Sequence, residues 1–281
     1  MKIVKILLII FILLLLVFLY SMFVGTTGLK IKEYKIVSPK ITEYYHGLKI
    51  VHLSDIHFGS TINEKELKTL TTEVNILKPD ILVFTGDLLD EPSEENNNIL
   101  IKYLSLMNAN LGRFAIYGNH DNVNEFNDII KKSKWTNLTD TYELVYSNSK
   151  EPIIISGMGS NYVDNSNINI KTEKFDEYIA NFGTDDIKPI YSILLMHEPD
   201  FIDNINIENY DLVLAGHSHG GQVRLPFIGK LYTPHGSKKY YDEYYKINNT
   251  DLYISSGLGT SIMPIRFFNR PSINFYRITK K

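Results

Sequence analysis

Histidine, aspartate and asparagine recur in five short motifs between residues 55 and 219. Their side chains offer carboxylates, imidazoles and one carboxamide, and the sequence has no cysteine. This set of donors suits a pair of Mn, Fe or Zn ions better than a structural zinc site. In chain order the motifs are Asp55-Ile56-His57, Gly86-Asp87, Gly118-Asn119-His120-Asp121, His197 and Gly216-His217-Ser218-His219.

A run of apolar residues typical of a buried strand ends just before each motif. Because the carboxyl ends of such strands meet at one edge of an α/β sheet, we expect the five motifs to converge there. Asn63 begins a helix with a capping box and Pro79 ends it, so the first two strands form a βαβ unit. The runs are Leu48–Leu53, Ile81–Thr85, Phe114–Tyr117, Ile190–Met196 and Leu212–Ala215.

The remaining patterns predict two sheets packed face to face with helices outside, the early half parallel and the later half antiparallel. The Asn- and Ser-rich stretch Ser160–Asn169 is typical of an exposed loop. Further helices are predicted at Glu94–Met107, Val123–Ser133 and Phe175–Phe182. Further strands are predicted at Tyr142–Tyr146, Ile153–Ser156, Val223–Leu225, Lys230–Tyr232, Lys239–Ile247, Leu252–Ser255 and Ile273–Ile278.

The order of the motifs resembles the signature of the calcineurin-like metallophosphoesterases, which reads DxH, GD, GNH[DE], H and GHxH. Each element is weak alone, but five in this order are specific. Gly220–Pro226 and Ser256–Thr260 are similar to a membrane-anchored bacterial branch, the YkuE-like and YaeI-like phosphodiesterases. The resemblance covers roughly residues 45–278. It implies a four-layer α/β/β/α sandwich of two mixed sheets flanked by helices, and hydrolysis of phosphoesters with two divalent metal ions.

The resemblance also implies that seven side chains hold these ions. Asp55 and His57 are two residues apart, and on an extended segment both would face the same way. His217 and His219 repeat that spacing. The first metal would take Asp55, His57 and His219, the second Asn119, His197 and His217, and Asp87 would bridge them.

His120 is not expected to be a ligand. By resemblance it stands beside the metals, where it protonates the leaving oxygen or stabilises the transition state. Asp121 would accept the Nδ1–H of His120 and set its tautomer. Two metals supply a bridging hydroxide that attacks phosphorus in line, and they neutralise the charge that develops.

Three further residues are candidates for contact with the substrate. Arg224 and Arg266 could hold a second phosphate or a lipid headgroup through a bidentate guanidinium, or they could be surface arginines. His235 lies in a Pro-His-Gly turn that could border the site. Phe227, Ile228 and Phe267-Phe268 favour core packing, with apolar lips near a membrane as the alternative.

Residues 6–24 are almost wholly apolar and long enough as a helix, about 28 Å, to cross a bilayer core. No A-x-A site follows, which favours a retained anchor over a cleaved signal sequence. We therefore expect an anchor at 1–25, a juxtamembrane connector at 26–40 and a catalytic domain at 41–281. The connector alternates polar and apolar residues, which predicts a strand leading from the membrane. The lysines that follow the span favour a cytoplasmic domain. The resemblance and the usual behaviour of N-terminal anchors favour an extracytoplasmic one, which we expect.

The net charge of −3 gives no basic field for nucleic acid, so no nucleic-acid partner is expected. The anchor and the lipid-active relatives of this branch favour a phosphodiester or pyrophosphate of a membrane lipid as substrate. A broad phosphomonoesterase, a nucleotide phosphodiesterase and a dimetal amide hydrolase are alternatives, as is a non-catalytic scaffold of the same fold. The complete set of ligands argues against the scaffold, and the sequence leaves the oligomeric state open.

Overall fold

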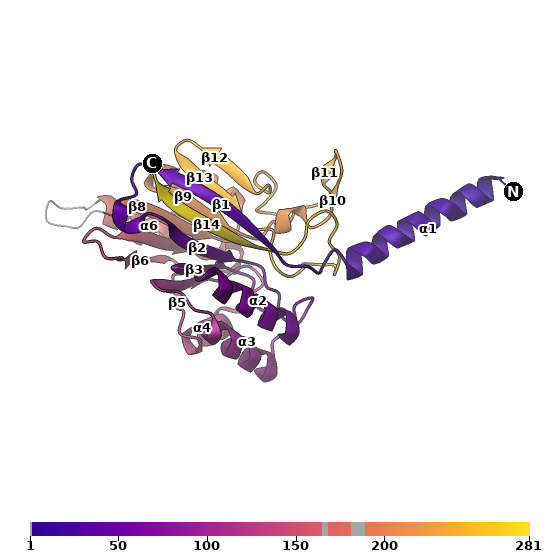
Figure 1. The fold of residues 1–281 in the computed structure, drawn as a ribbon, viewed down its shortest axis with the longest axis horizontal. Coiled ribbons are helices and arrows are strands. Elements are labelled where there is room, and N and C mark those ends of the chain that lie inside the picture. The colour runs from indigo at the N-terminus through magenta and orange to yellow at the C-terminus, as the bar shows by residue number, and fades with distance from the viewer. Residues whose placement is uncertain (1, 165–167, 181–188) are drawn as a thin grey trace.

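The computed structural model describes residues 2–164, 168–180 and 189–281 (Figure 1). The helices are α1 (Lys2–Phe23), α2 (Glu64–Leu77), α3 (Glu94–Leu106), α4 (Val123–Lys132), α5 (Asn161–Asp164) and α6 (Ile168–Ala180). The strands are β1 (Lys30–Ser38), β2 (Leu48–Leu53), β3 (Ile81–Thr85), β4 (Gly112–Ile116), β5 (Thr136–Asn137), β6 (Thr141–Val145), β7 (Ile153–Met158), β8 (Tyr191–Met196), β9 (Leu212–Ala215), β10 (Arg224–Leu225), β11 (Gly229–Lys230), β12 (Tyr244–Ile247), β13 (Thr250–Ile254) and β14 (Ser272–Lys280).

Within these residues the strands form two six-stranded sheets and one short hairpin, β10–β11. The first sheet has the order β1-β14-β2-β3-β4-β5, and the second β12-β13-β9-β8-β7-β6. β2 to β5 run parallel, as expected. The expectation of an antiparallel later half holds in part. β10–β11, β12–β13 and β14–β2 pair antiparallel, whereas β13 pairs parallel with β9.

Three apolar clusters separate four layers, which confirms the predicted sandwich. The first lies between α2, α3 and α4 and the outer face of the first sheet. The second lies between the two sheets, where Val83 and Phe114 face Ile155 and Leu214. The third packs α6, through Phe175, on the outer face of the second sheet. Alternation along the strands of each sheet therefore sends successive side chains to two different cores.

Local sequence signals explain the helix ends. Asn63 and Glu66 form the predicted capping box of α2.

The loop predicted at Ser160–Asn169 was wrong in two places. Asn161–Asp164 form the short helix α5, and the last two residues of the predicted loop begin α6. Residues 165–167 lie outside the described part of the chain. The predicted helix at 175–182 likewise begins earlier, and its last two residues are not described. The strand predicted at Lys239–Ile247 is limited to β12.

The segment after α1 belongs to the first sheet. β1 pairs parallel with β14 over nine residues, from Lys30 opposite Ser272 to Ser38 opposite Lys280. The strand expected within 26–40 is therefore present as β1, at the edge of the first sheet. α1 extends away from the sandwich beside the β10–β11 hairpin (Figure 1). This helix of 22 residues is strongly apolar after Lys5 and is long enough to cross a membrane.

Candidate metal centre

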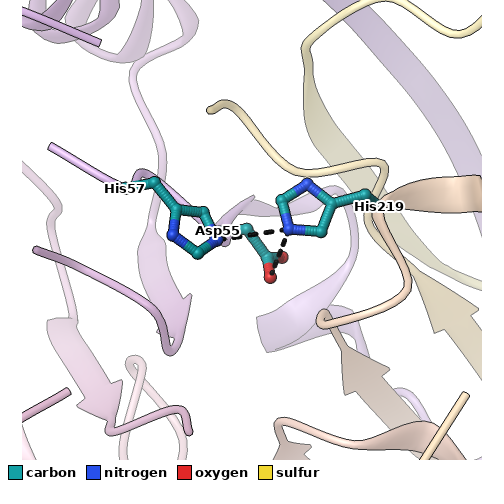
Figure 2. A group of neighbouring side chains, drawn as sticks. All are labelled: Asp55, His57 and His219. Atoms are coloured by element: carbon teal, nitrogen blue, oxygen red, sulfur yellow. Dashed lines mark hydrogen bonds and ion pairs between the residues drawn. The ribbon is translucent and has the colours of Figure 1, made fainter. Parts of the chain in front are cut away.

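The first group of possible ligands joins the loop after β2 to the loop after β9. Asp55, His57 and His219 each present one ligand atom, and these atoms all lie within 4.8 Å of one another. His219 Nε2 is 3.2 Å from His57 Nε2 and 3.5 Å from Asp55 Oδ1. Figure 2 shows the three side chains pointing toward one another. All three are buried, so their donor atoms face an interior site and not bulk water.

The second group comes from the ends of β3, β8 and β9. Asp87, His197 and His217 place their ligand atoms within 4.8 Å of one another, and all three side chains are buried. Asn119, which follows β4, directs Oδ1 to within 3.0 Å of His197 Nε2.

Asp87 lies between the two groups. Its Oδ2 is 3.2 Å from His197 Nε2 in the second group and 3.5 Å from His57 Nε2 in the first. The seven predicted ligands thus converge at one edge of the sandwich, as the position of the motifs after strands predicted.

Contacts behind the rings decide which imidazole nitrogens face the centre. His57 Nδ1 lies 2.7 Å from Asp90 Oδ1, and His197 Nδ1 lies 2.6 Å from the carbonyl oxygen of Thr85. Both rings therefore direct Nε2 inward. His217 uses Nε2 for the carbonyl oxygen of His235 at 2.8 Å, which leaves Nδ1 to face the centre. Such partners fix the orientation of a ligating ring.

The backbone at these ligands is not extended, contrary to the sequence-based argument from i, i+2 spacing. Asp55, His57, Asp87, His217 and His219 all have positive φ, between 47° and 65°. The side chains converge because successive left-handed turns re-aim the chain at each strand end. Non-glycine residues in this region cost roughly 1–3 kcal/mol each and concentrate at functional sites.

Two glycines allow the loops to approach closely. A Cβ on Gly86, whose φ is +99°, would lie 2.5 Å from the backbone nitrogen of Gly118. A Cβ on Gly118 would lie 2.3 Å from Asp87 Oδ1. Any larger residue at either position would push the β3 and β4 loops apart and displace Asp87.

Asp121 has a different role from the one expected. Its carboxylate accepts the backbone N–H groups of Asp87 at 2.9 Å, Leu88 at 2.8 Å and Gly118 at 2.8 Å. It therefore ties two ligand loops together and does not orient His120. Burial raises its pKa to about 6, with the charge of Asp87 adding to the effect.

Asp90 is the carboxylate that reaches His120. Its Oδ1, which also contacts His57, lies 3.8 Å from His120 Nδ1. The His120 and His57 rings meet edge to face at 5.0 Å, and 44% of the His120 side chain is exposed. Sequence reasoning missed Asp90, although its position three residues after Asp87 in Gly86-Asp87-Leu88-Leu89-Asp90 puts it in the same loop.

The two arginines predicted as candidate substrate contacts are both engaged within the protein. Arg266 is fully buried, and its guanidinium donates to the carbonyl oxygens of Ser256 and Gly259 behind His219, whose Nδ1 is 3.3 Å from Nη2. It is therefore neither a surface arginine nor open to substrate. Arg224 donates to Asp242 Oδ1 at 2.7 Å and to the carbonyl oxygen of Gly220 at 3.0 Å, so its fork is already engaged.

His235 does border the centre. Its backbone carbonyl oxygen accepts from His217, and its Nδ1 contacts the hydroxyl of Tyr162. The Tyr162 ring also lies 6.4 Å from the His217 ring. A neighbouring residue that sequence reasoning missed is Glu198, which follows His197 directly, is fully buried and accepts from the Ser160 hydroxyl.

Comparison with known proteins identifies this arrangement. Residues 48–221 match the sequence profile of the calcineurin-like phosphoesterases. The chain belongs to this family. The match spans more than half of the chain and includes all seven candidate ligands, so this protein is a metallophosphoesterase, a hydrolase that uses two divalent metal ions.

Relatives of this phosphoesterase resemble it over most of their length. The metallophosphoesterase YkuE of Bacillus subtilis is 32% identical over 92% of this chain and 88% of its own. The UDP-2,3-diacylglucosamine pyrophosphatase LpxG of Chlamydia muridarum is 27% identical over 85% of this chain and 86% of its own. A transmembrane protein with a metallophosphoesterase domain from Danio rerio is 27% identical over 87% of this chain and 56% of its own.

The electrostatics of the phosphoesterase fit a pair of cations. Burial opposes the charge of Asp87, but His197 and His57 outweigh it and hold the pKa of this carboxyl well below its usual range. Burial lowers the pKa of His197, but the charge of Asp87 and its hydrogen bond to the ring together have a larger effect. The pKa of His197 therefore lies well above its ordinary value. The buried carboxylates thus demand positive charge, which divalent ions supply when the imidazoles are neutral.

Two other imidazoles are already in the neutral form that a metal requires. Burial lowers the pKa of His217 to about 3. Burial, together with the neighbouring His57 and Arg266, lowers the pKa of His219 well below its ordinary value. Carboxylate, imidazole and amide oxygen are the donors that Mn, Fe and Zn accept.

Proposed function

We propose that this phosphoesterase hydrolyses a phosphodiester or pyrophosphate of a lipid at the membrane surface. The observation that carries the proposal is the pair of buried ligand groups joined by Asp87, in a chain whose apolar helix α1 leads directly into the catalytic sheet. The first feature supports phosphoester chemistry, and the second supports a substrate in the bilayer.

Seven side chains would hold the metals in the arrangement that the family resemblance implies. When bound, the two ions provide a nucleophilic water at neutral pH and neutralise charge on the phosphoryl oxygens. Two kinds of contact keep the donor atoms together. The Asp121 carboxylate accepts the backbone N–H groups of Asp87 and Gly118, and ring nitrogens that face away from the centre are hydrogen-bonded, as His197 Nδ1 is to the carbonyl oxygen of Thr85. The first ion would be held by Asp55, His57 and His219, the second by Asn119, His197 and His217, and both by Asp87.

His120 would act as the acid that protonates the leaving oxygen. Its ring is half-exposed at the mouth of the centre, so it can meet a substrate while the ligand rings stay buried. Its backbone N–H donates to Asp87 Oδ1 at 2.8 Å, which fixes its position relative to the proposed bridge. Asp90 lies beside Nδ1, so Nε2 is the nitrogen that would hold the transferred proton.

The lipid part of the proposal rests on two supports. A relative named as a pyrophosphatase of a diacylated sugar nucleotide shares 27% of its residues over most of both chains. α1 is suited to a single-pass anchor, which would keep the centre within a few tens of ångströms of the bilayer. We further propose that the domain, from β1 to the end of the chain, lies on the extracytoplasmic side.

A panel assay on the purified full-length protein tests this proposal. After reconstitution with Mn²⁺, the protein is given bis(p-nitrophenyl) phosphate, p-nitrophenyl phosphate, a nucleotide cyclic diester and a lipid pyrophosphate in nanodiscs. We expect the diester and the lipid pyrophosphate to be hydrolysed with the highest kcat/KM. A clear preference for the monoester or the nucleotide would replace the proposal with one of those activities. A metal-loaded protein that is inert on every substrate would indicate a scaffold.

A further inference from the structure

Several large apolar side chains lie exposed on the β10–β11 hairpin and on the loop between β13 and β14. Phe227 at the turn of the β10–β11 hairpin is fully exposed, Ile262 is 81% exposed and Phe268 is 68% exposed. The core packing expected for Phe227 and Phe268 from the sequence is therefore wrong. Single exposed apolar residues are ordinary, but a group of them on neighbouring loops marks a site that contacts lipid or protein.

An apolar cavity opens between these loops. Its volume is about 470 Å³, within the usual range for small-molecule sites. Val223 and Leu231 of the hairpin segment line one side, and Ile262 and Ile265 line the other. His219, a candidate metal ligand, also lines the cavity. The cavity therefore reaches the first metal group.

The side chain of Gln222 connects the two walls of the cavity. Gln222 donates from Nε2 to the carbonyl oxygens of Ser261 at 3.2 Å and Met263 at 2.9 Å, and its Oε1 accepts the backbone N–H of Ser261 at 3.0 Å. Both loops are thus fixed to each other, and the cavity is part of the folded structure.

The same loop is joined to the membrane helix. The backbone N–H of Arg266 donates to the carbonyl oxygen of Ser21 in α1 at 2.9 Å. The Tyr20 ring meets the Phe267 ring edge to face at 6.0 Å. Tyr20, Lys30 and Arg270 line a second hollow at this junction, and Tyr, Lys and Arg are residue types that favour the membrane–water interface.

Figure 1 shows β10 and β11 on the side of the sandwich from which α1 leaves. The cavity thus lies at the face that a spanning α1 would hold against the bilayer.

We infer that this cavity binds one acyl chain of the substrate lipid. The inference deepens the proposed function and rests on it. The acyl chain leaves the bilayer between Leu231 and Ile262, two exposed residues of the cavity wall, and lies along the cavity, and the phosphate reaches the metal centre beside His219. The occupant is a lipid chain because the loop that forms one wall of the cavity contacts α1, the helix proposed to span the membrane.

Chain-length selectivity of the full-length protein tests the inference. The protein in nanodiscs is given p-nitrophenyl phosphodiesters that carry no acyl chain, or a butanoyl, octanoyl or dodecanoyl chain. Each buried methylene can raise kcat/KM by up to about fourfold, so we expect a steep rise with chain length. A parent protein that hydrolyses the chain-free diester but is indifferent to chain length overturns the inference and leaves the proposed function standing.

Two variants locate the effect in the cavity. Leu231→Gln and Ile262→Gln place a polar group on exposed positions of its wall, so the fold should survive. The ratio of kcat/KM for the dodecanoyl probe to that for the chain-free probe should fall by at least about tenfold in each. Ile76→Gln, an exposed apolar position on α2, is the matched control and should keep the parent ratio.

Probe partition into the nanodisc affects all variants equally, so it cancels in this comparison. An unchanged ratio in both wall variants, or an equal fall in the Ile76→Gln control, overturns the inference. Loss of activity on every diester and pyrophosphate, in the parent itself, would instead remove the proposed function.

Discussion

Replacing Asp90 by asparagine should weaken metal binding, although Asp90 is not among the expected ligands. Its Oδ1 lies 2.7 Å from His57 Nδ1, and its side chain is 22% exposed. Asparagine keeps an acceptor oxygen of the same reach but loses the charge. A hydrogen bond to a charged group contributes roughly 1.5–3 kcal/mol and a neutral one roughly 0.5–1.5 kcal/mol, so keeping the bond but losing the charge should cost about 1 kcal/mol, or about fivefold in metal affinity. This is somewhat below the usual 10–100-fold effect of removing a partner behind a ligating histidine.

The assay is a Mn²⁺ titration of metal-free protein by calorimetry, followed by turnover of bis(p-nitrophenyl) phosphate at saturating Mn²⁺. Turnover should also fall, because His120 Nδ1 lies 3.8 Å from the same oxygen. Asp128→Asn is a matched control, since this carboxylate pairs with Lys132 on the exposed face of α4 and such pairs contribute little. An Asp90→Asn protein with parent affinity and parent turnover would refute the assigned contact.

Further predictions concern Asp87 as the proposed bridging ligand, the pH dependence of metal binding, His120 as the proposed acid, and proteins that lack α1. Asp87→Ala should lose metal and nearly all activity, which metal analysis checks; a metal-loaded variant would contradict the bridging role. Because Asp87 raises the pKa of His197 above its ordinary value, that ring carries a proton at neutral pH before metal binds. Mn²⁺ affinity should therefore increase, with proton release, as the pH rises from neutrality toward the raised pKa of His197, and an affinity independent of pH would count against this. His120→Ala should keep both metals but slow turnover by roughly 10²–10⁴, whereas metal loss would make it a ligand. A protein that begins at Thr26 retains β1 and should be soluble, fold and hydrolyse a chromogenic diester, with a lower rate than the full-length protein on a bilayer lipid. One that begins at Ile41 loses the nine-residue pairing with β14 and should melt at a lower temperature; equal melting temperatures would show that β1 adds no stability.

The convergence of the ligands could be predicted from the sequence for a physical reason. Each motif follows a run of apolar residues, and parallel strands such as β2, β3 and β4 carry their carboxyl ends to one edge. The unbroken apolar run of α1 and the capping box of α2 are likewise local signals. Residue type and the position of the motifs after apolar runs therefore sufficed for the layers, the apolar helix α1 and the place of the metal centre.

What the sequence could not predict depends on contacts between distant segments. The carboxylate of Asp121 turns toward three backbone amides, two of them more than 30 residues away, and leaves the His120 ring to Asp90. Arg266 was open to interpretation as a surface residue, but folding buries it behind His219. Neither outcome has a local signature, because a charged side chain is paired according to whichever groups the fold brings beside it.

The exposed apolar residues and the segment after α1 show most clearly the difference between what sequence and tertiary structure decide. By composition alone, Phe227 and Phe268 favour a core, and the alternation in residues 26–40 predicts a strand but not the partner of that strand. In the folded chain β1 pairs with β14, and the backbone N–H of Arg266 donates to the carbonyl oxygen of Ser21 near the end of α1. Phe268, in the same loop as Arg266, lies exposed beside α1. Sequence thus determined which residues could do the chemistry, and tertiary packing decided which face they present, because burial and pairing depend on neighbours far along the chain.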